Sequence, residues 1–225
     1  MPEPGHIEAC IRSASFEPLG WLEHSPEAGF DGSSLLLVGN AGPAMYERFA
    51  AQRDRAHDKM DDWTREVLAP LATQLGAQAV FPFDVPHPPF LRWARAARAG
   101  FTSPLGLNIR ADFGLWHAFR AAFIFKDDLT IPACEDGAQV PPCETCADKP
   151  CLTACPVSAF SGTAYDVAAC AGHLGSPQGA PCRSDGCLAR LACPIAPGYR
   201  YAPGQMRFHM VAFMQARGVD PAQFD

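Results

Sequence analysis

Cysteine is the residue type whose spacing carries the most chemical information in this sequence. Eight of the ten cysteines lie between residues 143 and 193, whereas Cys10 and Cys134 stand apart and are interpreted as ordinary thiols. Thiolates are soft ligands, which suit iron-sulfur clusters. Two groups of four each end in Cys-Pro: Cys143-x2-Cys146-x4-Cys151-x3-Cys155-Pro156 and Cys170-x11-Cys182-x4-Cys187-x5-Cys193-Pro194.

The Cys-Pro endings predict how the thiols divide between two 4Fe-4S clusters. An iron-sulfur cube takes one thiolate at each of four iron corners, and in two-cluster ferredoxins the cysteine before proline ligates the other cluster. Four residues separate Cys146 from Cys151, whereas two residues separate the corresponding cysteines of the bacterial ferredoxin run. The long gap between Cys170 and Cys182 leaves the pairing of the second cluster open. The predicted first cysteine set is Cys143, Cys146, Cys151 and Cys193, and the second cysteine set is Cys155, Cys170, Cys182 and Cys187.

Cys151 and Cys155 are expected on one helix that starts near Pro150. Residues four apart share a helix face and are offset by about 6 Å along the axis. We therefore expect the two thiols to serve different clusters.

Two other interpretations of the cysteines remain open. A disulfide framework is typical of small secreted chains, which this chain does not resemble in size. Structural zinc is also compatible with Cys143-x2-Cys146, although paired zinc sites rarely use two Cys-Pro endings.

The periodicity of the chain predicts an α+β protein, in which a mixed α/β domain precedes a ferredoxin-like dicluster module. Leu35–Val38 reads as a buried strand, followed by a glycine turn and a helix from Pro43. A core-facing helix begins near Met60 and stops at Gly76, and Pro70 should kink or shorten it. Further strands are expected at 79–81 and 123–125. The predicted divisions are 1–140 for the mixed domain, 141–200 for the dicluster module and 201–225 for a closing amphipathic helix and tail.

Composition narrows the functions and the location. The formal charge of −6 opposes a phosphate backbone, so nucleic acid is not expected as a partner. Arginines gather only at 92–98, where a solvated helix face is the favoured interpretation. No apolar run approaches the roughly 20 residues that span a bilayer, and the first thirty residues lack the pattern of a secretory signal. We expect no membrane association and a cytoplasmic location.

Segments ahead of the cysteines carry a family resemblance. Phe83-Asp84, Pro86, an alanine-rich stretch from Trp93 to Gly100, and Phe113-Gly114-Leu115-Trp116 occur in that order before the cysteine groups. In this order the chain resembles epoxyqueuosine reductase, a cobalamin and iron-sulfur enzyme, over about half its length. Residues Gly114 to His117 also resemble a stretch found in short bacterial ferredoxin-like proteins.

The resemblance implies specific roles. Asp84 would match the family's proton donor, and the N-terminal domain would match its nitroreductase-like, cobalamin-binding fold. The alternative for Asp84 is a turn-stabilising aspartate between prolines. The family's helical-repeat tail has no counterpart here, so a tRNA substrate is not implied. His117 is interpreted as a packed aromatic neighbour rather than a ligand.

Three hypotheses follow. The first is an electron-transfer protein in which two adjacent clusters relay single electrons between a donor and an acceptor. The partner would be a redox partner protein or a small-molecule electron acceptor. The second is a reductase whose N-terminal domain binds cobalamin or a flavin, with Asp84 as the acid. The third is a binding or sensing protein in which clusters or zinc mainly hold the C-terminal module folded.

Overall fold

The computed structural model describes residues 2–25, 28–52, 59–132 and 140–224. Contacts between these residues divide the chain into two compact units. The sheet unit contains residues 1–100 and 117–139, and the cysteine unit contains residues 101–116 and 140–225. Cys134 lies outside the described residues.

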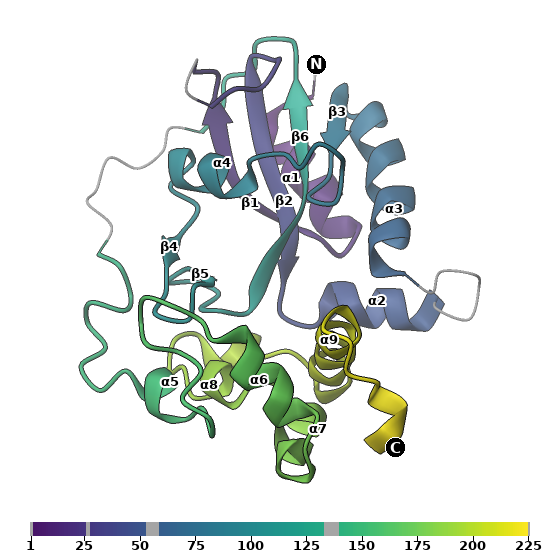
Figure 1. Ribbon diagram of the computed structural model, residues 1–225. Coiled ribbons are helices and arrows are strands. Elements are labelled where there is room, and N and C mark those ends of the chain that lie inside the picture. Colours follow the sequence, from purple (N-terminus) through teal and green to yellow (C-terminus); the bar gives the residue numbers. More distant parts are fainter. Residues whose placement is uncertain (1, 26–27, 53–58, 133–139, 225) are drawn as a thin grey trace. The chain divides into compact units, whose positions relative to one another are not determined.

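A four-stranded antiparallel sheet organises the sheet unit (Figure 1). Its spatial order is β1-β2-β6-β3, so the last strand in sequence lies between the second and the third. Neighbouring strands pair antiparallel throughout. The strands are β1 (Glu17–Glu23), β2 (Ser34–Ala41), β3 (Ala77–Val80) and β6 (His117–Phe125).

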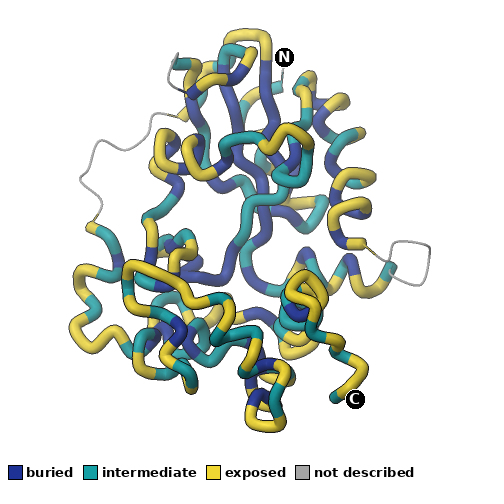
Figure 2. The backbone as a smooth tube through the Cα atoms, viewed as in Figure 1, coloured by how far each residue is buried: buried dark blue, intermediate teal, exposed yellow. Residues whose placement is uncertain are grey.

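Burial of the central strands explains why this sheet forms. Residues Leu35 to Val38 of β2 are fully buried, and residues Ala121 to Phe125 of β6 are nearly so (Figure 2). A strand that is apolar on both faces must be covered on both, and this requires helices. The helices of the sheet unit are α1 (Pro4–Ser13), α2 (Ala44–Gln52), α3 (Met60–Gln74) and α4 (Phe90–Ala96).

Most expected elements of the sheet unit are present. The glycine turn expected at residues 39–42 is wrong in extent, because β2 continues to Ala41. The strand at 35–38 lies inside β2, and α3 begins at Met60 and ends just before Gly76, whose φ of +78° suits a helix stop. Of the two effects expected from Pro70, shortening is wrong, because the helix continues to Gln74, and a kink stays a prediction. Trp63, Leu68 and Ala72 are buried along α3, and this packing compensates for the hydrogen bond that proline removes.

Short helices joined by loops build the cysteine unit. They are α5 (Pro150–Thr153), α6 (Val167–Leu174), α7 (Ala180–Asp185), α8 (Leu188–Leu191) and α9 (Pro203–Ala216), with 3-10 turns at Pro177–Gly179, Pro197–Tyr199 and Pro221–Phe224. A two-stranded ribbon pairs β4 (Phe101–Thr102) with β5 (Asn108–Ile109). The closing helix expected around Met206 to Met214 is α9. The coarse prediction of an α+β protein is therefore confirmed.

The ribbon segment belongs to the cysteine unit, although it precedes the cysteines by some 30 residues. Leu105, Ile109 and Leu115 share one buried cluster with Cys151 and Cys193. Composition alone placed this segment in the N-terminal domain. The linear division at residues 140 and 200 stays a prediction.

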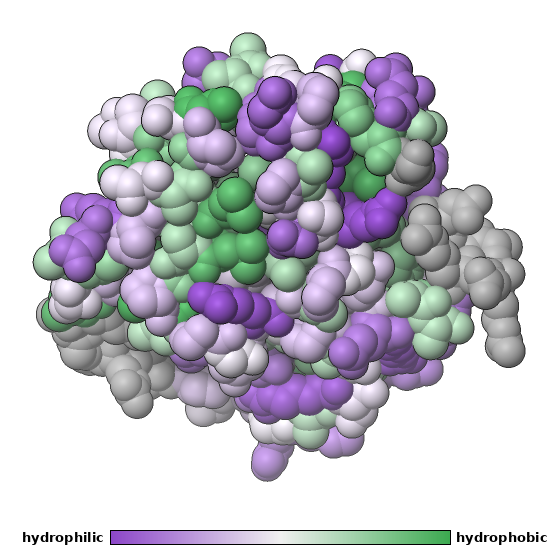
Figure 3. Space-filling view, turned by 90° about the horizontal axis from the view of Figure 1, so that it is seen from below, coloured by the Kyte–Doolittle hydropathy of each residue, from purple (hydrophilic) through white to green (hydrophobic). Residues whose placement is uncertain are grey.

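The surface mixes hydrophobic and hydrophilic residues. Figure 3 shows one face, on which hydrophobic residues gather in a patch bordered by hydrophilic ones. Exposed large apolar side chains include Val85, Leu91, Leu107 and Val140. Within the described part of the chain, no helix is long and apolar enough to cross a membrane.

Candidate metal centres

The first cysteine set is brought together around α5 and α8. Cys151 lies in α5, Cys143 and Cys146 precede that helix, and Cys193 follows α8. Burial raises the pKa of the Cys143 thiol, and the neighbouring sulfurs of Cys193, Cys151 and Cys146 raise it further. Charges influence one another in this way only at short range, so these four thiols are neighbours in space.

Backbone geometry and two cations shape the surroundings of the first set. Lys149 adopts a left-handed conformation with φ of +38°, which turns the loop into α5. The backbone N–H of Leu152 donates a hydrogen bond to the Cys151 sulfur, and the N–H of Ile195 donates to Cys193. Positive charge on Lys149 acts on Cys143, and that on Arg200 acts on Cys193. These groups offset part of the effect of burial, which raises the pKa of Cys143, Cys151 and Cys193.

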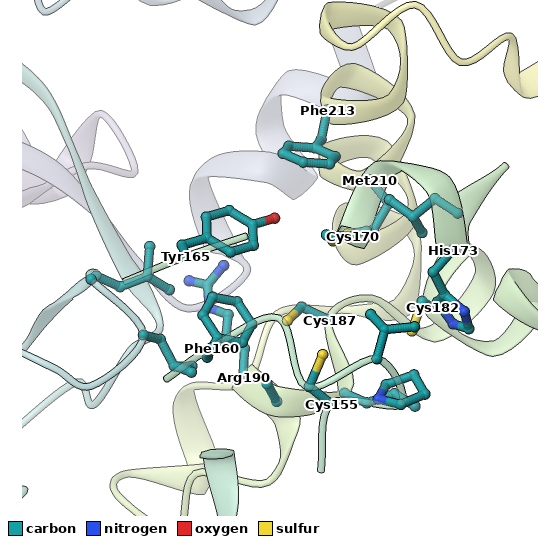
Figure 4. A pocket seen from close by; sticks show the side chains of 18 residues that line it. Cys155, Phe160, Tyr165, Cys170, His173, Cys182, Cys187, Arg190, Met210 and Phe213 are labelled. Atoms are coloured by element: carbon teal, nitrogen blue, oxygen red, sulfur yellow. The ribbon is translucent and has the colours of Figure 1, made fainter. Parts of the chain in front are cut away.

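The second cysteine set lines a cavity of about 490 Å³ within the cysteine unit (Figure 4). Cys155 follows α5, Cys170 lies in α6, Cys182 lies in α7, and Cys187 is the N-cap residue of α8. Most of the remaining lining is apolar, including Phe160, Leu174, Met210 and Phe213. Four separate segments thus direct thiols toward one apolar space.

Each sulfur of the second set accepts a hydrogen bond. Cys155 accepts from the backbone N–H of Ala159 at 3.3 Å. Cys182 accepts from the N–H of Leu188, and Cys187 accepts from the N–H groups of Ala189 and Arg190. Cys170 is hydrogen-bonded to the Tyr165 hydroxyl. Donors aimed at sulfur stabilise the thiolate form, which is the form that binds metals.

Burial opposes ionisation of these thiols while no cation is bound. It raises the pKa of Cys170, Cys182 and Cys187, and the sulfur of Cys155 raises all three further. Burial likewise raises the pKa of Tyr165, and the sulfurs of Cys170, Cys187 and Cys155 add to the effect. Thiolates crowded in an apolar space need a compensating positive charge, which iron supplies.

The structure brings the thiols of each predicted set near one another, and their division between two clusters and their binding of metal stay predictions. All nine described cysteines are free thiols. Within residues 2–25, 28–52, 59–132 and 140–224, no three Cys, His, Asp or Glu side chains form a ready group for a metal ion.

The expectation that Cys151 and Cys155 share one helix face is wrong. The helix begins at Pro150 as expected but ends at Thr153, so Cys155 lies in the turn beyond it. The N–H of Ala154 bonds to the carbonyl of Pro150, and that of Ser158 bonds to the carbonyl of Cys155. A new turn therefore starts at Cys155 and directs its sulfur to the second set.

Phe113 to Trp116 anchors the ribbon to the cysteine loops. The Arg190 guanidinium hydrogen-bonds to the Leu115 carbonyl and lies 4.7 Å from the centre of the Trp116 ring and 4.5 Å from that of Tyr201. Gly114 has φ of +57°, and a Cβ there would clash with the Ile195 carbonyl oxygen. This stretch thus supports the loop that carries Cys193.

Asp84 lies in the sheet unit, in a turn that it stabilises itself. Its carboxylate accepts a hydrogen bond from the Phe81 N–H at 2.8 Å and one from Arg65 at 2.5 Å. The Arg65 guanidinium also lies 4.4 Å from the centre of the Phe81 ring. These contacts match the turn-stabilising alternative, and the role of catalytic acid stays a prediction. His117 is buried in β6 and meets the Phe119 ring edge to face at 6.1 Å, as expected of a packed aromatic neighbour.

Sequence reasoning missed two residues of the cysteine unit, Tyr165 and Arg190. Tyr165 precedes Cys170 by five residues, and Arg190 lies between Cys187 and Cys193. The signals in the sequence that could have identified them are a tyrosine hydroxyl and an arginine charge close to the expected cysteine ligands.

Known structures supply a likeness of fold. The chain is similar to an epoxyqueuosine reductase solved with an epoxyqueuosine-modified tRNA stem loop, at 14% identity and a TM-score of 0.51, over 88% of this chain and 66% of that protein. It is also similar to epoxyqueuosine reductase from Bacillus subtilis, at 13% identity and a TM-score of 0.49, over 87% of this chain and 65% of that one. The chain thus spans about two thirds of the length of these proteins.

No protein-family model and no curated protein sequence matches the chain. At such low identity the structural likeness concerns the fold alone. It bears out the expected resemblance to epoxyqueuosine reductase at that level.

Proposed function

We propose that this protein binds two 4Fe-4S clusters, one on each cysteine set, and transfers electrons between a redox partner protein or small-molecule acceptor and a second reactant. The observation that carries the proposal is the apolar cavity lined by the four thiols of the second set. Four soft ligands around one space match the ligand requirement of an iron-sulfur cube. When bound, such clusters supply one-electron redox chemistry.

The residues of the cysteine unit fit clusters in their donor chemistry. Each set provides four free thiols, and backbone N–H groups donate to several of the sulfurs. Second-shell hydrogen bonds of this kind orient ligands and adjust the potential of a metal centre. The apolar lining of Phe160, Met210 and Phe213 limits water around the second set.

Measurement of metal content tests the proposal directly. Protein purified without oxygen should contain about eight iron atoms and about eight acid-labile sulfides per chain, the content of two cubes. Broad visible absorption and an electron paramagnetic resonance signal after dithionite should accompany them. Stoichiometric zinc without iron, or no metal at all, would contradict the proposal.

A second candidate is a reductase in which the sheet unit binds cobalamin or a flavin and the clusters supply its electrons. The fold likeness to epoxyqueuosine reductase favours it. Asp84 is the candidate acid, although its contacts with Arg65 and Phe81 are those of a turn residue. Titration of cluster-loaded protein with cobalamin or flavin distinguishes the candidates, since a reductase should bind one of them stoichiometrically.

The second candidate bears on whether nucleic acid is a binding partner. One neighbouring structure contains a tRNA stem loop, which conflicts with the expectation from net charge that nucleic acid is no partner. Net charge averages over the whole surface, whereas binding depends on local positive charge. Binding of a tRNA stem loop at low salt, lost at high salt, would support a nucleic-acid partner.

A further inference from the structure

Tyr165 is fixed beside the second cysteine set by the start of α6. It pairs with Phe160 in an isolated antiparallel bridge, and the N–H of Asp166 bonds to the Ala159 carbonyl at 2.8 Å. The Asp166 carboxylate then caps α6 by accepting from the Ala169 N–H at 2.9 Å. This cap sets the position of Cys170 relative to Tyr165, because both ends of the segment are held by hydrogen bonds.

Two aromatic rings lie beside the tyrosine ring. It stacks on Phe160 with ring centres 4.6 Å apart and planes 13° apart, and Phe213 lies 6.5 Å away. Stacked rings leave the side chain little rotational freedom. Figure 4 shows the hydroxyl directed toward Cys170, to whose sulfur it is hydrogen-bonded.

We propose that Tyr165 is a positioning residue that raises the reduction potential of the second cluster by donating a hydrogen bond to the Cys170 sulfur. This inference rests on the proposed function. Reduction adds one electron, and part of the added negative charge resides on the ligand sulfurs. A fixed hydroxyl donor stabilises the reduced cluster more than the oxidised one, so the potential rises.

The test compares Tyr165→Phe with Tyr199→Phe in cluster-loaded protein. Tyr165→Phe removes the hydroxyl and retains the ring that stacks on Phe160. Tyr199 is a matched control, because it is exposed to a similar degree and packs against Phe113 in the same unit. Both variants are titrated potentiometrically, with iron content measured on the same samples.

Tyr165→Phe should lower the reduced-to-oxidised ratio of one cluster about fivefold at a fixed potential. That change corresponds to about 40 mV, since a tenfold change is 59 mV for a one-electron couple. The reduction potential of the other couple should stay unchanged, and Tyr199→Phe should shift the potential of neither couple. Unchanged couples in Tyr165→Phe with full iron content would overturn this inference and leave the proposed function intact. Absence of iron from the wild-type protein would overturn the proposed function itself, and this inference with it.

A second measurement leaves the fold undisturbed. Replacing the four tyrosines by 3-fluorotyrosine during expression makes every hydroxyl a stronger donor without changing the sequence. The couple that falls in Tyr165→Phe should rise in the fluorinated protein. If neither couple rises in fluorinated protein with full iron, the inference is overturned, even if Tyr165→Phe loses its clusters.

Discussion

The two cysteine sets share a ligand chemistry and differ in their surroundings. Cations act on the first set, through Lys149 at Cys143 and Arg200 at Cys193. The second set faces a mostly apolar cavity, which Arg190 and His173 also line, and a tyrosine hydroxyl. Charge, hydrogen bonding and exposure set cluster potentials over a wide range. The difference therefore predicts two clusters with distinct potentials on one short chain.

Removing one thiol from either set tests whether the two sets are separate metal sites. This is the largest effect that we expect. Cys146→Ala and Cys170→Ala should each reduce the iron content from about eight to about four atoms per chain, because three thiolates hold a cube poorly. Iron analysis and electron paramagnetic resonance on anaerobic protein measure the loss. Cys10→Ala is the control, since Cys10 lies in α1, outside both sets, and should retain all the iron. Full iron in either set variant would contradict the assignment.

Gly114→Ala should destabilise the cysteine unit at the loop that follows Cys193. The substitution places a side chain at φ of +57° and a Cβ against the Ile195 carbonyl, two residues after Cys193. Backbone strain and overpacking together should lower the free energy of unfolding by about 3 kcal/mol. Urea unfolding of cluster-loaded protein measures this change.

Gly106→Ala is the matched control for Gly114→Ala. Gly106 also has positive φ, at +73°, but a Cβ there meets nothing within 4 Å. The control should cost about 1 kcal/mol, from backbone strain alone. Equal losses in the two variants would show that the contact with the Ile195 carbonyl contributes nothing.

Arg190→Lys tests the anchor that connects the ribbon to the loop between Cys187 and Cys193. Lysine keeps the charge and loses the planar fork that bonds to the Leu115 carbonyl and stacks on Trp116. We expect a loss of about 1 to 2 kcal/mol in unfolding free energy. Arg217→Lys is the control, because Arg217 lies against Phe213 without that bond to the ribbon. A loss of equal size in both variants would contradict the anchoring role.

The grouping of the thiols could be predicted from the sequence, whereas their supports could not. Cys-Pro endings and spacing are local features, and so are the apolar run of β2 and the glycine that ends α3. The hydrogen bond from Arg190 to Leu115 joins residues 75 positions apart, and no local sequence pattern predicts such a contact. The continuation of α3 past Pro70 was missed for the same reason, since burial along α3 overrides a local helix-breaking preference.

Removing the cations of the first set should produce the smallest effect. Lys149→Met and Arg200→Met each take away a positive charge that favours the reduced, more negative cluster. Both residues are exposed, so solvent screens them and the couple of the first set should fall by only about 10 to 20 mV at low salt. The shift should vanish near 1 M salt, where the Debye length is about 3 Å. Lys126→Met removes an exposed charge from the sheet unit and should move neither couple. If the shifts in Lys149→Met and Arg200→Met appear instead in the couple that responds to Tyr165→Phe, the contrast between Lys149 and Arg200 at the first set and the tyrosine hydroxyl at the second set fails.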